Sequence, residues 1–87
     1  MNNKILIKLI VPDLDNTYDI FIPVNELVWR VKKLIVKTVI DLANIESNEN
    51  AQYILINKSN TRIYQNNEII INTDIRNGTE LILLCQI

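Results

Sequence analysis

The stretch Glu80-Leu81-Ile82-Leu83-Leu84-Cys85-Gln86-Ile87 is the most informative part of this 87-residue chain for its fold. It is a short apolar run that follows the turn-forming pair Asn77-Gly78, which is typical of a buried β-strand. We therefore predict a last strand over residues 80–87. Such a strand needs hydrogen-bonding partners, and these must come from the segments that precede it.

Two strands and a turn are predicted at the beginning of the sequence. Residues 4–11 and 17–22 are apolar or alternate in polarity, and the segment 12–16 between them is rich in turn-forming residues. They predict an N-terminal hairpin. Its first strand should turn one set of side chains toward the core: Ile5, Ile7, Leu9 and Val11.

One long helix is predicted after Pro23, with Asn25 as N-cap, Glu26 in its first turn and its end near Leu42. At about 100° per residue, eight side chains fall on one broad arc that should face the core. They are Leu27, Val28, Val31, Leu34, Ile35, Thr38, Val39 and Leu42.

The remaining segments complete the order of elements. Residues 44–50 form a polar loop, 53–57 a third strand, 62–64 a short fourth strand, and 65–74 a connection with one helical turn around 69–71. The order strand, strand, helix, strand, strand, strand is that of the ubiquitin-like β-grasp fold, an α+β class. By analogy, we expect a single domain over residues 1–87, with a mixed sheet of about five strands around one helix and the two terminal strands paired at its centre.

The end of the sequence bears on the chemistry. A ubiquitin-like protein that acts by conjugation or sulfur carriage needs a flexible diglycine end whose carboxylate reaches an activating enzyme. This sequence ends in Gln86-Ile87. We therefore expect non-covalent protein contact rather than carboxyl transfer.

Composition excludes several function classes. The chain is 48% hydrophobic, which is typical of a globular protein. Its net charge of −1 gives no electrostatic field that would recruit nucleic acid or an anionic membrane. No apolar run is long enough for a membrane span or a signal peptide, so we expect a cytoplasmic protein without direct membrane insertion. A single cysteine, Cys85, permits no intramolecular disulfide.

Catalytic and metal chemistry are not indicated. The chain has no histidine, and Gly78 is its only glycine, so it has neither a His-based catalytic pair nor a phosphate-binding glycine loop. Asp13 and Asp15 are too few oxygens for a calcium loop and are interpreted as turn formers. We expect no enzyme activity, no cofactor and no metal.

The helix carries a second apolar face. Trp29, Val36 and Ile40 fall opposite the core arc and are bordered by Lys33, and a single sheet can cover only one of the two faces. We call these four residues the helix stripe and predict a partner or self-association surface there. Two alternatives are that segment 65–74 or 44–50 folds over the stripe, or that Trp29 lies flat on the surface.

The sheet offers another candidate surface, which the sequence favours slightly. If Ile54, Ile56, Leu81 and Leu83 face the helix, the opposite face is unusually apolar for a solvated sheet. It would be formed by Leu6, Ile10, Phe21, Leu55, Ile82 and Leu84. It fits a protein-binding surface or, alternatively, a homodimer interface.

Two stretches resemble a known family. The segments Thr17-Tyr18-Asp19-Ile20-Phe21-Ile22-Pro23 and Asp74-Ile75-Arg76-Asn77-Gly78-Thr79-Glu80-Leu81-Ile82-Leu83-Leu84 are similar to the small bacterial ubiquitin-like proteins of the YukD and EsaB family, which are encoded with type VII (ESAT-6/WXG100) secretion systems. The chain departs from that family in its extension Cys85-Gln86-Ile87.

The resemblance implies a function but transfers no catalytic or binding residue. It implies a cytosolic accessory or regulatory protein of a Gram-positive type VII secretion system, whose partner is the membrane ATPase or another component. The alternatives are a ubiquitin-like modifier or sulfur carrier, and a small accessory subunit of an enzyme complex.

Overall fold

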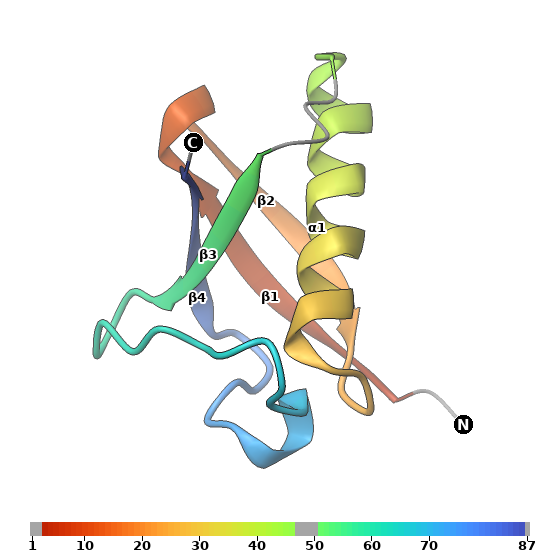
Figure 1. Cartoon of the computed structure of the whole chain (residues 1–87), viewed down its shortest axis with the longest axis vertical. Coiled ribbons are helices and arrows are strands. Elements are labelled where there is room, and N and C mark those ends of the chain that lie inside the picture. The colour runs from red at the N-terminus through yellow and green to blue at the C-terminus, as the bar shows by residue number, and fades with distance from the viewer. Residues whose placement is uncertain (1–2, 47–50, 87) are drawn as a thin grey trace.

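The computed structural model describes residues 3–46 and 51–86 (Figure 1). Its elements follow the predicted order. They are strand β1 (Lys4–Val11), the 3-10 turn η1 (Pro12–Leu14), strand β2 (Asn16–Pro23), helix α1 (Val28–Ala43), strand β3 (Gln52–Asn57), the 3-10 turn η2 (Ile70–Asn72) and strand β4 (Glu80–Gln86).

The two terminal strands pair at the centre of the sheet, as predicted. The strand order is β2-β1-β4-β3, with β1 antiparallel to β2 and parallel to β4. The Asn77-Gly78 turn aligns β4 with β1: the Asn77 side-chain oxygen accepts from Leu6 N (2.7 Å), and Gly78 N donates to Leu6 O (2.8 Å). Gly78 has a φ of 84°, a conformation that side-chain-bearing residues rarely adopt. In residues 3–46 and 51–86, the mixed sheet and the one α-helix form the β-grasp arrangement.

Helix α1 packs across one face of the sheet (Figure 1). Val28, Val31, Ile35 and Val39 are buried at intervals of three to four residues. The predicted core arc was too wide, because Leu34 and Leu42 are 43% and 62% exposed. A helix on a sheet buries a narrow stripe, and residues at its margins stay in solvent.

The predicted helix start was also wrong. The helix begins at Val28, and its N-cap Leu27 makes no side-chain capping hydrogen bond to the part of the chain that the structure describes. The first N–H groups are bonded instead by backbone carbonyls of the later connection: Val28 N donates to Glu68 O (2.8 Å) and Trp29 N to Asn66 O (3.3 Å). These bonds satisfy donors that a capping side chain would otherwise take.

The predicted fourth strand, 62–64, is only a single bridge. Ile63 lies opposite Ile56, flanked by hydrogen bonds from Asn57 N to Arg62 O (2.8 Å) and from Tyr64 N to Leu55 O (3.1 Å). Over residues 3–46 and 51–86 the sheet therefore has four strands. The helical turn predicted around 69–71 is confirmed as η2.

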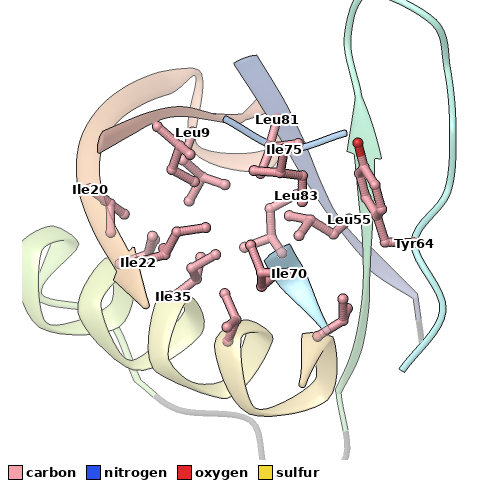
Figure 2. Close-up of a cluster of buried hydrophobic side chains, with 14 of the residues drawn as sticks. Leu9, Ile20, Ile22, Ile35, Leu55, Tyr64, Ile70, Ile75, Leu81 and Leu83 are labelled. Carbon is pink, nitrogen blue, oxygen red and sulfur yellow. The ribbon is translucent and has the colours of Figure 1, made fainter. Parts of the chain in front are cut away.

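The face predicted for Leu55 was wrong. β3 pairs with β4 so that Leu55 lies opposite Leu83 and Ile54 opposite Leu84, and residues paired across strands share a face. Leu55 is fully buried and points toward α1 with Leu83 (Figure 2). Ile54 and Ile56 therefore lie on the outer face. Because residues 53–56 are all apolar, alternation of polarity could not indicate which set points inward.

A polar cluster anchors the connection between β3 and β4. The buried Tyr64 hydroxyl donates to the Asp74 carboxylate and accepts from Asn57 Nδ2 (3.1 Å). Arg62 bridges Glu68 (2.5 Å) and Asp74 (3.5 Å). The cluster holds the bridge segment 62–64 against β3, at one edge of the core (Figure 2).

Candidate protein-interaction surfaces

The face of the sheet turned away from α1 carries a row of apolar side chains. Ile10 lies opposite Ile82, Ile82 opposite Ile56, and Ile56 opposite Ile63, so four side chains cross three strands and the bridge segment. The pair Ile54 and Leu84 adjoins this row. We call these six residues the outer-face patch. Ile63 is 56% exposed and the other five are half-buried.

Leu6 and Phe21 lie on the same face but not in the patch. They oppose each other on β1 and β2. A row of charges separates them from the patch: Lys8 lies opposite both Asp19 and Glu80, and Lys58 pairs with Glu80 at 3.4 Å. The sequence-predicted surface is therefore two surfaces: the outer-face patch on β1, β4, β3 and the bridge segment, and the small pair Leu6 and Phe21 on β1 and β2 beyond the charged row.

Three members of the outer-face patch were missed by the sequence interpretation: Ile54, Ile56 and Ile63. The first two follow from the inverted face of β3. Ile63 reaches this face only through its bridge with Ile56, a long-range pairing that local sequence does not specify.

The helix stripe lines a groove between α1 and the beginning of β3. The groove has a volume of about 750 Å³, and Trp29, Lys33, Val36 and Ile40 form its helix side. Residues 51–53 form the other wall. The structure thus brings the whole predicted stripe together and adds a wall of strand that the sequence did not predict.

The stripe is not covered by segment 65–74, one of the two covers considered above. Asn66 contacts the backbone of Trp29, yet the Trp29 side chain is still 40% exposed. Lys33 Nζ and Arg30 Cζ lie 5.6 and 5.8 Å from the centroid of its ring. In the other segment considered, 44–50, residues 47–50 lie outside the described residues.

One lysine reaches across the groove. Lys32 Nζ donates to the backbone oxygen of Tyr53 at 3.0 Å, so its ammonium group joins α1 to β3. Burial lowers the pKa of Lys32, because the charged form loses part of its hydration. Burial, followed by the neighbouring Cys85, raises the pKa of the Tyr53 hydroxyl.

The remaining sequence candidates have structural roles. Asp15 has a φ of 48° and its N–H donates to Pro12 O (3.0 Å), so it forms the turn between β1 and β2. Among residues 3–46 and 51–86, no three His, Cys, Asp or Glu side chains gather closely enough to hold a metal ion.

Cys85 is half-buried on β4, opposite Tyr53. In the part of the chain that the structure describes, no helix has the length and apolarity needed to cross a membrane.

Comparison with solved structures shows the fold. The chain is similar to the ubiquitin-like domain of EccD5 from Mycobacterium xenopi, with a TM-score of 0.76 and 10% identity over 98% of this chain and 97% of that one. The chain has the ubiquitin-like β-grasp fold. The N-terminal ubiquitin-like domain in the 4931431F19Rik protein is also similar, with a TM-score of 0.68 and 17% identity over 97% and 76% of the two chains.

A chain of the MycP5-free ESX-5 inner membrane complex, in state II, is also similar to this chain in structure. Its TM-score is 0.76 at 10% identity, over 98% of this chain. This chain spans about a fifth of that chain, 21% of its length. No family model and no curated protein matches the sequence.

Proposed function

We propose that this chain is a non-enzymatic, cytosolic accessory or regulatory protein of a type VII secretion system, and that it acts by non-covalent contact through the outer-face patch. The observation that carries the proposal is the continuous apolar row on a solvent-facing sheet. Ubiquitin-like folds of the same shape occur in EccD5 and in the ESX-5 inner membrane complex, which is a type VII system.

The outer face of the sheet departs from the pattern of a solvated sheet. Sheets that face water on one side normally carry polar residues there. Here six apolar side chains adjoin one another across the strands, and a row of charges, Asp19, Lys8, Glu80 and Lys58, crosses the sheet at one end of the patch. An apolar centre with a charged margin is the arrangement of protein-binding surfaces.

The partner class follows from the resemblance to the YukD and EsaB family together with the fold. The partner we propose is a component of a Gram-positive secretion machine, such as its membrane ATPase. This chain would bind it as a single domain. Because the outer-face patch is a candidate dimer interface as well, self-association is an outcome that the test must separate from partner binding.

We expect Leu84→Asp to weaken capture of the partner while the fold persists. Leu84 is half-buried within the outer-face patch, and a carboxylate there would have to be desolvated at the contact. The measurement is affinity isolation of the tagged chain from its native host, with quantitative mass spectrometry. We expect at least a tenfold loss of the secretion component, about 1.4 kcal/mol or more.

The matched control is Leu42→Asp. Leu42 is 62% exposed on α1, away from the outer sheet face, so the same chemical change should leave capture unaltered. Thermal unfolding of both variants checks the fold, and light scattering of the purified chain reports self-association. Equal capture by Leu84→Asp and wild type, or capture of only a metabolic enzyme, would contradict the proposal.

A further inference from the structure

The groove between α1 and β3 has features that the outer-face patch lacks. We call it the α1–β3 groove. Its lining combines an apolar floor, a basic rim and strand backbone. The floor is formed by Trp29, Val36, Ile40 and Tyr53.

Within residues 3–46 and 51–86, the strand wall of the groove has an open edge. β3 is the last strand of the sheet, and its pairing with β4 turns the N–H and C=O groups of alternate residues away from β4. Segment 62–64 forms hydrogen bonds with Leu55 O and Asn57 N, which lie on that outward side. By the same alternation, the backbone groups of Tyr53 point outward, and Ala51 immediately precedes the strand. Both residues line the groove.

Lys32 is hydrogen-bonded to one of these outward-pointing backbone groups. Its ammonium donates to Tyr53 O, the position that the N–H of an added strand would take. A strand that replaced this bond would release the ammonium of Lys32 beside it. A carboxylate on the incoming strand could then pair with Lys32, and its charge would compensate for the partial burial of the ammonium.

The charge of the rim sets the chemistry of the occupant. Lys32, Lys33 and Lys37 line the groove, and Asp41 is the one acidic residue among its lining residues that the structure describes. Three ammonium groups against one carboxylate favour an acidic occupant. The apolar floor favours aliphatic side chains over a bare phosphate or nucleic-acid backbone.

We propose that the α1–β3 groove binds a short acidic segment of another protein, in extended conformation, by adding it as a strand to the open edge of β3. Its aliphatic side chains lie against Trp29, Val36 and Ile40, and its flanking Asp or Glu residues pair with Lys32, Lys33 and Lys37. An extended segment suits the site better than a helix, since a helix has no backbone groups left for the edge of β3. This site is independent of the outer-face patch.

The test uses the full chain and a synthetic peptide, Asp-Glu-Val-Ile-Val-Ile-Asp-Glu. Trp29 is the only tryptophan, so a shift in its emission reports occupancy of the groove. We expect saturable binding with a dissociation constant below about 1 mM. On binding, the amide of Tyr53 should move downfield in a nitrogen–proton correlation spectrum and become protected from hydrogen exchange.

Two changes to the peptide separate strand addition from charge alone. A peptide with N-methylated central residues keeps the charge and lacks the backbone donors, and a peptide with Lys in place of Asp and Glu keeps the donors. Both should bind at least tenfold more weakly. Binding of either peptide at the affinity of the parent would overturn the proposal, as would no binding of the parent at about 1 mM.

Variants of the protein locate the site. Lys33→Glu combined with Lys37→Glu should weaken binding of the peptide at least tenfold, because it reverses two of the positive charges on the rim. Both side chains are exposed, so their charges can be reversed without disturbing the core. Lys4→Glu, on the outer sheet face, should have no such effect. A loss of binding in Leu84→Asp with none in the groove variant would place the peptide on the outer-face patch and overturn the inference.

Discussion

Leu55→Ala is expected to lower the free energy of unfolding by about 2–5 kcal/mol. Leu55 is fully buried between the sheet and α1, where it contributes to the core with Leu83 and Ile70 (Figure 2). Truncation removes buried apolar surface and leaves a cavity that the surrounding side chains fill only in part. Denaturant unfolding, with a check that the dependence on denaturant is unchanged, measures the effect.

The matched control is Ile54→Ala, one residue away on the other face of β3. Ile54 is half-buried, so its truncation should cost about 1 kcal/mol or less. The comparison bears on function, because the same register places Ile54 and Ile56 in the outer-face patch. If Ile54→Ala lowered the free energy of unfolding more than Leu55→Ala did, Ile54 would have to face the core. Ile54 and Ile56 would then not belong to the outer-face patch.

Tyr64→Phe is expected to destabilise the chain by about 1–3 kcal/mol. The variant keeps the buried ring but deletes the hydroxyl that donates to Asp74 and accepts from Asn57 Nδ2. Asn57 is itself buried, so its amide would lose a partner that water cannot easily replace. Denaturant unfolding near neutral pH gives the value.

The dependence of this loss on pH identifies the hydroxyl as its cause. Burial, and then the hydrogen bond to Asp74, raises the pKa of Tyr64 to about 12 from 10.0. A raised folded-state pKa gives stability that is complete below the unfolded value and is lost as pH rises from about 10 to about 12, which amounts to about 2–3 kcal/mol. The stability difference between wild type and Tyr64→Phe should therefore shrink over that range.

The acid side has the opposite sign. The hydrogen bond from Tyr64 lowers the pKa of Asp74 below 3.8, so its stabilisation is present above that value and is lost as pH falls through the folded-state pKa. The difference between wild type and Tyr64→Phe should shrink in acid as well. A difference that stays constant from neutral pH into both extremes would show that the hydroxyl network does not stabilise the fold.

Much of the fold could be predicted because its elements carry local signals. The hairpin, the helix and the last strand each have a clear period or a turn signal, such as Asn77-Gly78. The helix start could not be predicted, since its N–H groups are bonded by the carbonyls of Asn66 and Glu68 from a distant segment. A sequence pattern contains no record of such pairings.

The candidate surfaces were predictable in kind but not in membership. An excess of apolar residues on the sheet was evident, yet the inward set of β3 could not be chosen when Ile54, Leu55 and Ile56 are all apolar. The charged row through Lys8 and Glu80 depends on strand register. The helix stripe stays a predicted interaction surface; its four residues line one groove, and the edge of β3 that completes this groove came only from the structure.

Site-specific photo-crosslinking in the native host tests whether the outer-face patch contacts a secretion component. A photo-crosslinking amino acid is placed at position 63, in the outer-face patch, or at position 42 on α1, two sites whose native side chains are 56% and 62% exposed. We expect a crosslink to a secretion component from position 63 and none from position 42. A crosslink from position 42 alone, or none from position 63, would contradict it.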